Sequence, residues 1–542
     1  MLLAIFLAWL QAAASAPAAP QAPPQPVIKI TTRQVEISVV ARDKKGQPVA
    51  DLTRDDFTLL DGGQPQEIRY FHFEKEEPHA EMAALPAGVV SNRVLAAGDG
   101  RSVALPNALT VILLDGLNSR FADRSLARDG LRKFLSTLTN NDRVAIYTLT
   151  TELRVLHDFA ADLAPLQEAL APHKRKDVPP SAEAAAQGAA IDRFLSESMS
   201  PTIVNFPQLR TPTTMQALRA IAAQLAGIPG RKTLVWLSDG FPLVVGRRAN
   251  GMPGRNFETF GDEEQRAIRT LDNAGVVIYP VDARGMIGSF DWQPSTDPSR
   301  TPPRSRRAAA RMDNQAQTEI VESQGGLREI ADGTGGTAFT NDNDLGSAIR
   351  HAVEDSAVSY TIAYSPSHND WNGEFRDLKL TVKRPGVEVH YRKGYYATPD
   401  KADDATSRQA ALVAAAGSPL PSTALGIFAQ IKPAATPAIV QMRINPAGLN
   451  LSRDSAGIWI GMIDVALLSR DASGRACSQA SAHTYKLTLT QAQYDEARQN
   501  GVPLEAGVPA CTTAARARVV VRDVATGATG SLDVPLGAPS GK

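Results

Sequence analysis

The chain has 542 residues, 57 basic and 57 acidic side chains, and a hydrophobic content of 43%. A chain of this length is too long for one hydrophobic core, so several domains are expected. The balanced charge argues against a general nucleic-acid or anionic-membrane binder, because both need an excess of basic side chains. We therefore expect a multidomain globular protein that does not bind nucleic acid.

The amino terminus has the pattern of a secretory signal peptide. Residues 2–10 form an apolar run too short to span a bilayer, and small residues with Ala-x-Ala cleavage options follow it. We expect residues 1–16 to be a signal peptide and residues 17–26 an Ala/Pro/Gln-rich tether. The mature protein is then expected in the periplasm or outside the cell. No later segment is apolar enough for a membrane helix, so no transmembrane segment is expected.

Residues 27–80 have the pattern of a small β unit. The stretch "VEISVVARD" alternates toward an apolar face, "KKGQP" marks a turn, and two further strands surround the glycine pair of "LLDGGQP". Residues 74–105 contain several Pro and Gly and are expected to form a linker.

Residues 105–397 alternate between apolar runs and helical patterns. Runs such as "LTVILLD" do not alternate, which is typical of strands buried on both faces of a parallel sheet. Between them, Met215, Leu218, Ile221 and Leu225 share one helical face. We predict a doubly wound, mainly parallel α/β sheet to which "VSYTIAYS" adds a strand. The same region is expected to carry an insertion at 172–213, a loop at 286–318 and a closing β hairpin at 374–397.

Residues 419–537 are β-rich and are expected to form a β-sandwich domain with one helix. Thr490 is a suitable N-cap for that helix, Gln493 completes a capping box, and Gly501 ends it. The only cysteines, Cys477 and Cys511, lie in this region. In an exported protein they are expected to form a disulfide, and the alternative is two buried thiols. Neither has a His at a metal-ligand spacing, so no zinc site is expected.

Acidic and hydroxyl side chains follow the ends of two predicted strands. Asp115 and Ser119 follow the first strand, and Asp239 ends "LVWLSDG". Carboxyl ends of parallel strands meet at one sheet edge, which is where such sheets bind ligands. Thr211, Thr213 and Thr214 precede the middle helix, so oxygens from three loops could hold Mg²⁺. Alternatively, Asp115 fixes the turn or caps the next helix.

These residues resemble the von Willebrand factor type A domain and its metal-ion-dependent adhesion site. The family pattern is Asp-x-Ser-x-Ser, a Thr before a middle helix, and an Asp on the fourth strand. Asp115, Ser119 and Asp239 match it, and the Thr falls on Thr211 or Thr213. Leu117 replaces the first Ser and offers no oxygen, so the resemblance implies weakly bound Mg²⁺ or Mn²⁺. In that pattern Asn118 faces away from the ligands. Two longer stretches, "VVARDKKGQPVADLTRDDFTLLDGG" and "VKRPGVEVHYRKGYYA", are similar to the von Willebrand factor A-related family described from acidobacteria.

The resemblance implies an exported, non-enzymatic binding or adhesion-type protein. Its degenerate adhesion site would take a protein partner through an acidic residue of that partner. The sequence contains no His-Glu-x-x-His, Gly-x-Ser-x-Gly or Walker pattern, so no enzyme is expected. The alternative is a metal-free structural or scaffolding protein of the cell envelope.

Overall fold

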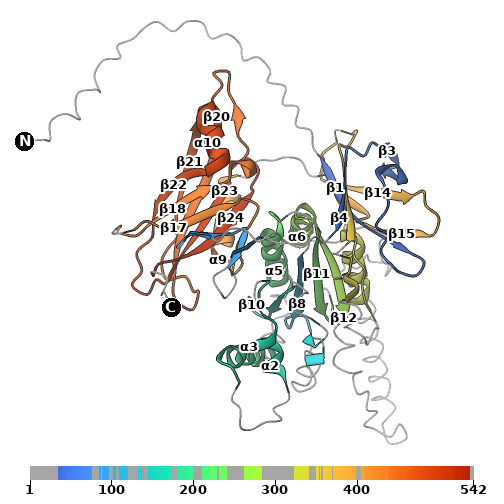
Figure 1. Cartoon of the computed structure of the whole chain (residues 1–542), viewed down its shortest axis with the longest axis horizontal. Coiled ribbons are helices and arrows are strands. Elements are labelled where there is room, and N and C mark those ends of the chain that lie inside the picture. Colours follow the sequence, from blue (N-terminus) through green and yellow to red (C-terminus); the bar gives the residue numbers. More distant parts are fainter. Residues whose placement is uncertain are drawn as a thin grey trace, which may run out of the picture.

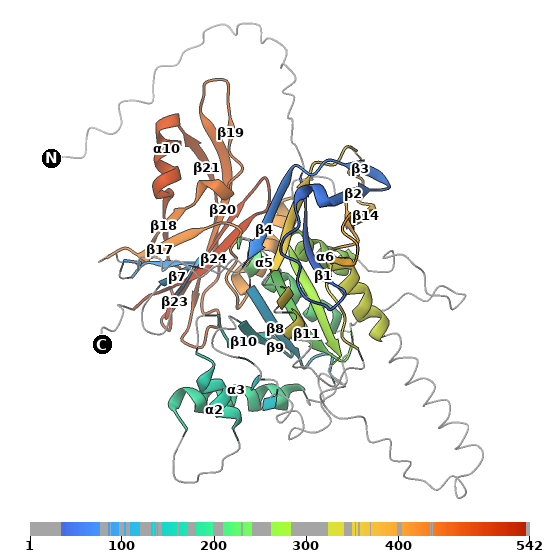
Figure 2. The ribbon, with the colours of Figure 1, turned by 45° about the vertical axis from the view of Figure 1, so that its right-hand side comes forward.

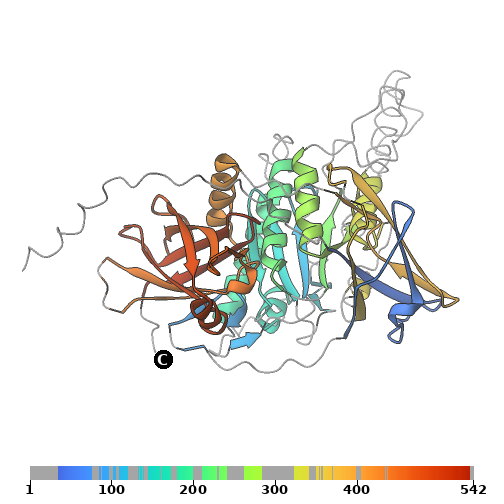
Figure 3. The same ribbon diagram turned by 90° about the horizontal axis from the view of Figure 1, so that it is seen from above.

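The computed structural model describes the chain in segments. These are residues 34–75, most of 85–96, 102–104, 109–119, parts of 132–138, 144–159, 162–171, 180–198, 210–228, 231–240, 262–282, 323–340, most of 350–397 and nearly all of 404–537. The predicted signal peptide, the tether and the loop at 286–318 lie outside them. Figure 3 shows a central α/β module with one β module on each side.

The central sheet has five strands in the order β10-β9-β8-β11-β12. They span Leu153–His157, Val144–Leu149, Leu109–Asp115, Lys232–Ser238 and Val276–Asp282. The last four strands of this order are mutually parallel, and β10 is an antiparallel edge. All residues of the four parallel strands are buried, as their unbroken apolar runs predicted. The protein is therefore a mixed α/β protein with a mainly parallel central sheet.

Helices cover both faces of this sheet. Val111 and Leu113 of β8 lie in one core with α5 (Arg210–Leu225) and α6 (Asp262–Asn273). The intervening Ile112 and Leu114 lie in the other core with α2 (Ala164–Leu170) and α3 (Ala182–Ser198). The predicted apolar face of α5 is confirmed, because all four of its residues are buried: Met215, Leu218, Ile221 and Leu225. None of the described helices is long and apolar enough to cross a membrane.

The first β module combines two segments that are far apart in the chain, residues 35–75 and residues 358–396. Its two sheets, β15-β1-β13-β4 and β16-β14-β2-β3, share one hydrophobic core. The strands are β1 (Val35–Asp43), β2 (Phe57–Asp61), β3 (Gln64–Gln66), β4 (Tyr70–Lys75), β13 (Val358–Tyr364), β14 (Phe375–Val382), β15 (Val387–His390) and β16 (Gly394–Tyr396).

This pairing differs from the sequence expectation for "VSYTIAYS". We expected it in the central sheet, but β13 pairs antiparallel with β1 and β4. The unit expected at 27–80 is thus completed by β13 and by the hairpin expected to close the α/β domain. A short apolar run looks the same in either sheet, because the run itself does not specify its partner.

The second β module also has two sheets around one core, in the orders β22-β18-β17-β5 and β19-β20-β23-β24, with β21 beside β20. The strands are β17 (Ile427–Ile431), β18 (Ile439–Ile444), β19 (Ser452–Arg453), β20 (Trp459–Arg470), β21 (Ser481–Leu489), β22 (Val502–Gly507), β23 (Arg516–Asp523) and β24 (Thr529–Pro535). β5 (Val90–Ser91) comes from the expected linker, which also supplies the pair β6 (Val94–Ala96) and β7 (Ser102–Ala104).

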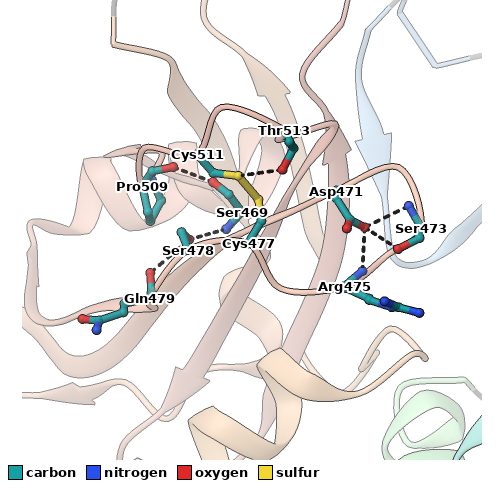
Figure 4. The surroundings of a disulfide bond; sticks show 10 residues. All are labelled: Ser469, Asp471, Ser473, Arg475, Cys477, Ser478, Gln479, Pro509, Cys511 and Thr513. Atoms are coloured by element: carbon teal, nitrogen blue, oxygen red, sulfur yellow. Dashed lines mark hydrogen bonds between the residues drawn. A yellow bond between two sulfur atoms is a disulfide. The ribbon is translucent and has the colours of Figure 1, made fainter.

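Two helices accompany these sheets, α9 (Ala405–Gly417) and α10 (Gln491–Asn500). The predicted ends of α10 are confirmed: Thr490 and Gln493 form a capping box, and Gly501 follows with φ of 77°. The predicted disulfide is present, with 6.0 Å between the Cα atoms of Cys477 and Cys511. Figure 4 shows that it joins the turn after β20 to the loop before β23.

Both β modules contact the amino end of the central sheet. Arg231 precedes β11, and its backbone N–H donates to Glu74 Oε2 of β4 (3.1 Å) while its guanidinium donates to Ser38 Oγ of β1 (2.8 Å). The Thr423 hydroxyl donates to the Gln224 carbonyl at the end of α5 (2.6 Å). In Figures 1 and 2 the β modules lie toward one end of the central sheet and α2 and α3 toward the other. Among the described residues, the β modules thus contact the central sheet at its amino end, and α2 and α3 lie toward its carboxyl end.

Candidate functional site

Asp115, the last residue of β8, is fully buried at the carboxyl edge and accepts five hydrogen bonds. Its Oδ1 accepts from the backbone N–H groups of Leu117 (3.1 Å) and Asn118 (3.0 Å). Two of the donors to Oδ2 come from β11, Trp236 Nε1 (2.9 Å) and Ser238 Oγ (3.1 Å). The carboxylate thus fixes the turn after β8 and fastens that turn to the neighbouring strand.

Asn118 supplies the remaining donor to Oδ2. Its side-chain Nδ2 donates to Asp115 Oδ2 (2.7 Å) and to Thr214 Oγ1 (2.9 Å). Thr214 is fully buried on α5, so one amide group joins the end of β8 to that helix. The family pattern led us to expect Asn118 to face away from the site, but it lies at its centre.

Burial raises the pKa of Asp115, because the charged form loses its water. Hydrogen bonds from Asn118, Trp236 and Ser238 oppose this rise, since they stabilise the charged form.

Ser119 and Asp239 lie next to this cluster. The Asp239 backbone N–H donates to Ser119 Oγ (3.1 Å), which ties the loops after β8 and β11 together. Ser323 Oγ donates to the Asp239 carbonyl (2.5 Å). Ser119 is buried and Asp239 is half-buried. Of the predicted ligands, the structure therefore places Asp115, Ser119 and Asp239 at one edge.

The threonines are distributed differently from the sequence prediction. Thr214 makes the hydrogen bond to Asn118, whereas Thr213, one position earlier, is half-buried on α5. Thr211 also lies in α5, and its side chain is outside the described residues. The helix thus contributes the third threonine of "TPTT" to the cluster.

Leu117 is a core residue. Its side chain is 4% exposed and belongs to the core cluster that contains Met215 and Leu218 of α5. The turn residue Gly116 has no room for a side chain, because a Cβ would lie 1.9 Å from Ser198 Oγ on α3. The turn after Asp115 is therefore enclosed by α5 and α3, and the position after Gly116 points inward.

The donors Trp236, Ser238 and Asn118 were not predicted from the sequence. For Trp236 a signal exists: a buried Trp needs an acceptor for its N–H, and a carboxylate at the end of the neighbouring strand can provide one. The strand register accounts for Ser238: Leu237 pairs with Leu114, so the next residues along the two parallel strands, Ser238 and Asp115, lie side by side. No comparable signal exists for Asn118, whose direction depends on the turn.

The donor set fits a divalent cation poorly. A carboxylate offers about four lone-pair sites, and five donors already approach the two oxygens of Asp115. Leu117 offers no oxygen, and Thr214 accepts from Asn118. Among the described residues, no group of three or more His, Cys, Asp or Glu side chains could hold a metal ion.

No family model matches the chain, and no curated protein matches it. Among solved structures, an aerotolerance-related membrane protein from Bacteroides fragilis is 14% identical, with 45% of this chain and 98% of that chain covered and a TM-score of 0.23. A von Willebrand factor type A structure from Catenulispora acidiphila is 15% identical, with coverage of 65% and 81% and a TM-score of 0.23. Proximal thread matrix protein 1 from the mussel byssus is 14% identical, with 51% of each chain covered and a TM-score of 0.22. These scores are low, and the arguments below use the geometry of this chain.

Proposed function

We propose that this protein is an exported, non-enzymatic binding protein whose carboxyl sheet edge contacts a protein partner. The observation that carries the proposal is the organisation of that edge. The turn after β8 is fixed by Asp115 through Trp236 and Ser238, and the backbone of Asp239 is fixed by Ser119. A surface that is already ordered binds more tightly, because less conformational entropy is lost on binding.

The position of the β modules supports the same assignment. Glu74 and Thr423 hold them to Arg231 and to the end of α5, at the amino edge of the sheet. In α/β proteins of this kind the ligand usually approaches the carboxyl edge. We propose that the partner makes hydrogen bonds to the polar groups around Ser119 and Asp239, with no bridging cation.

The Cys477–Cys511 bridge supports the proposed export, because disulfides persist in oxidising compartments. We propose that residues 1–16 are a signal peptide and that the mature chain is periplasmic or secreted. Amino-terminal sequencing of protein from fractionated cells tests this: the mature chain is expected to begin within residues 14–17. An intact Met1 on cytoplasmic protein would contradict it.

Affinity capture tests the binding role. Immobilised wild type, Asp239→Ala and the control Asp55→Ala are exposed to envelope and culture fractions from the source cells. Asp55 lies in the first β module with its side chain 91% exposed. Asp55→Ala therefore removes one negative charge, as Asp239→Ala does, but away from the carboxyl edge. We expect wild type and Asp55→Ala to retain the same protein and Asp239→Ala to lose it. Equal retention by all three would contradict the proposed edge.

A scaffolding role in the cell envelope is the second candidate. It is favoured by buried polar contacts that join the first β module to the central sheet: Arg42 of β1 and Tyr279 of β12 both donate to Asp355 (2.8 and 2.6 Å). In this alternative the two sheets of the second β module would act as a rigid β sandwich. Partner binding through a β module, insensitive to Asp239→Ala, is the outcome that favours it.

A further inference from the structure

The amide of Asn118 connects two oxygens that belong to different elements. Its Nδ2 lies 2.7 Å from Asp115 Oδ2, at the end of β8, and 2.9 Å from Thr214 Oγ1, on α5. A side-chain amide has two N–H donors, so each of these oxygens receives one. Asp115 and Thr214 are both fully buried, and Asn118 between them is half-buried.

Joining a carboxylate oxygen to a hydroxyl oxygen is also what a divalent cation does when it lies between two elements. We propose that Asn118 takes the place of a cation in this chain, so that the carboxyl edge keeps its shape without a metal ion. The inference deepens the proposed function, since it makes partner binding at this edge independent of divalent cations.

The bonding of Asp115 supports this assignment. Besides Asn118 Nδ2, its Oδ2 receives the N–H of Trp236 and the hydroxyl of Ser238. A cation placed at the amide position would therefore have to displace a donor that already forms a hydrogen bond with the carboxylate. The geometry favours the neutral amide, which satisfies both oxygens and adds no charge that must be compensated.

Leu117 gives a second, independent observation. Its buried side chain packs in the same core as Met215, next to Thr214 on α5. The turn is thus fastened to α5 by an apolar contact at one residue and by an amide at the next. A seryl hydroxyl in place of Leu117 would enter that apolar core, so the position of the first Ser in the family pattern cannot supply a ligand here.

The test is a set of unfolding midpoints measured on the full chain in excess EDTA and in excess MgCl₂ or MnCl₂. We expect the wild-type midpoint to be the same in all three. In Asn118→Asp a second carboxylate replaces the amide beside Asp115. Because two adjacent carboxylates repel, its midpoint should fall by at least about 3 °C in EDTA and recover in Mg²⁺ or Mn²⁺.

Asn92→Asp is the matched control. Asn92 is buried, whereas Asn118 is half-buried, and the Nδ2 of Asn92 likewise donates twice, to the carbonyls of Ser422 (2.6 Å) and Leu425 (2.7 Å). It contacts no carboxylate through these bonds, so its variant should lose stability equally with and without cation.

Two results would overturn the inference. One is a wild-type midpoint that rises in Mg²⁺ or Mn²⁺, or heat of binding when either ion is titrated into the wild type. The other is an Asn118→Asp midpoint that is lowered to the same extent in every buffer. If that variant does not fold, the wild-type measurements still decide the question. The midpoints need no partner, so either result leaves the capture experiment to be judged separately.

Discussion

At the scale of single residues, the burial of Leu117 accounts for the leucine at a position where the family pattern has Ser. Its side chain is buried with Phe159 and Met215, so the turn needs an apolar group there for packing. We predict that Leu117→Ser lowers the free energy of unfolding by about 2–5 kcal/mol, the range for removing a buried leucine side chain. Chemical denaturation followed by circular dichroism measures this.

Val413→Ala is the control for that prediction, because Val413 is 56% exposed and loses little contact on truncation. It should change the free energy of unfolding by less than about 0.5 kcal/mol. A Leu117→Ser protein as stable as wild type would show that this position does not need an apolar side chain, and the adhesion-site interpretation of it would regain support.

Asp272 gives a prediction about pH. It lies near the end of α6, where burial raises its pKa from 3.8 to about 7 and Arg392 partly opposes the shift. Between these values the folded state binds more protons than the unfolded state. Stability should therefore fall as pH rises from about 4 to about 7. In Asp272→Asn this contribution is absent, so unfolding titrations across that range should give a flatter dependence. Equal slopes for both proteins would contradict the assignment.

At the scale of elements, the disulfide closes the long excursion between β20 and β23. The two cysteines are separated by 34 positions and join the segments that flank β21, α10 and β22. For a loop of this size a disulfide contributes about 3–4 kcal/mol through restriction of the unfolded chain. We predict a loss of that size in Cys477→Ser/Cys511→Ser, measured by denaturant unfolding. Quantitative thiol labelling of the native exported protein would show that the bridge does not form.

Local patterns predicted the elements of this fold well. The uninterrupted apolar run of β8 and the capping box of Thr490 and Gln493 each depend on neighbours in sequence, and both are present. Strand pairing depends on tertiary contacts, so β13 was assigned to the wrong sheet and β5 was taken as linker. An apolar run indicates that a strand is buried, but it does not indicate which of two sheets the strand belongs to.

The site was predictable to a similar extent. Three acid or hydroxyl residues lie at one edge because the ends of parallel strands coincide, and this follows from strand order. The direction of Asn118 could not be derived in that way. It depends on a turn in which Gly116 is pressed against α3 and Leu117 is drawn into the core. The contact at Gly116 is made by α3, which lies within the insertion expected at 172–213. The sequence predicted the bounds of this insertion but did not indicate where it packs on the sheet.

At the scale of the whole molecule, a chain of buried hydrogen bonds joins the first β module to the central sheet. Arg42 Nε of β1 donates to Asp355 Oδ1 (2.8 Å), and the hydroxyl of Tyr279 on β12 donates to Asp355 Oδ2 (2.6 Å). Arg231 donates to the Tyr279 hydroxyl (2.8 Å) and to Ser38 of β1. Asp355 belongs to neither sheet, and its carboxylate binds Arg42 of the first β module and Tyr279 of the central sheet. We therefore expect the two modules to unfold together.

Removal of that carboxylate tests this coupling. Asp355→Ala leaves the Arg42 guanidinium buried without its partner, which is expected to cost about 3–5 kcal/mol. The exposed pair of Arg384 and Asp51 is the control, because Asp51→Ala should cost no more than about 1 kcal/mol. Since Asp355 couples the modules, its loss should also separate unfolding followed by tryptophan fluorescence from unfolding followed by far-ultraviolet circular dichroism. Coincident transitions with a loss as small as that of Asp51→Ala would mean that the Asp355 carboxylate does not couple the first β module to the sheet.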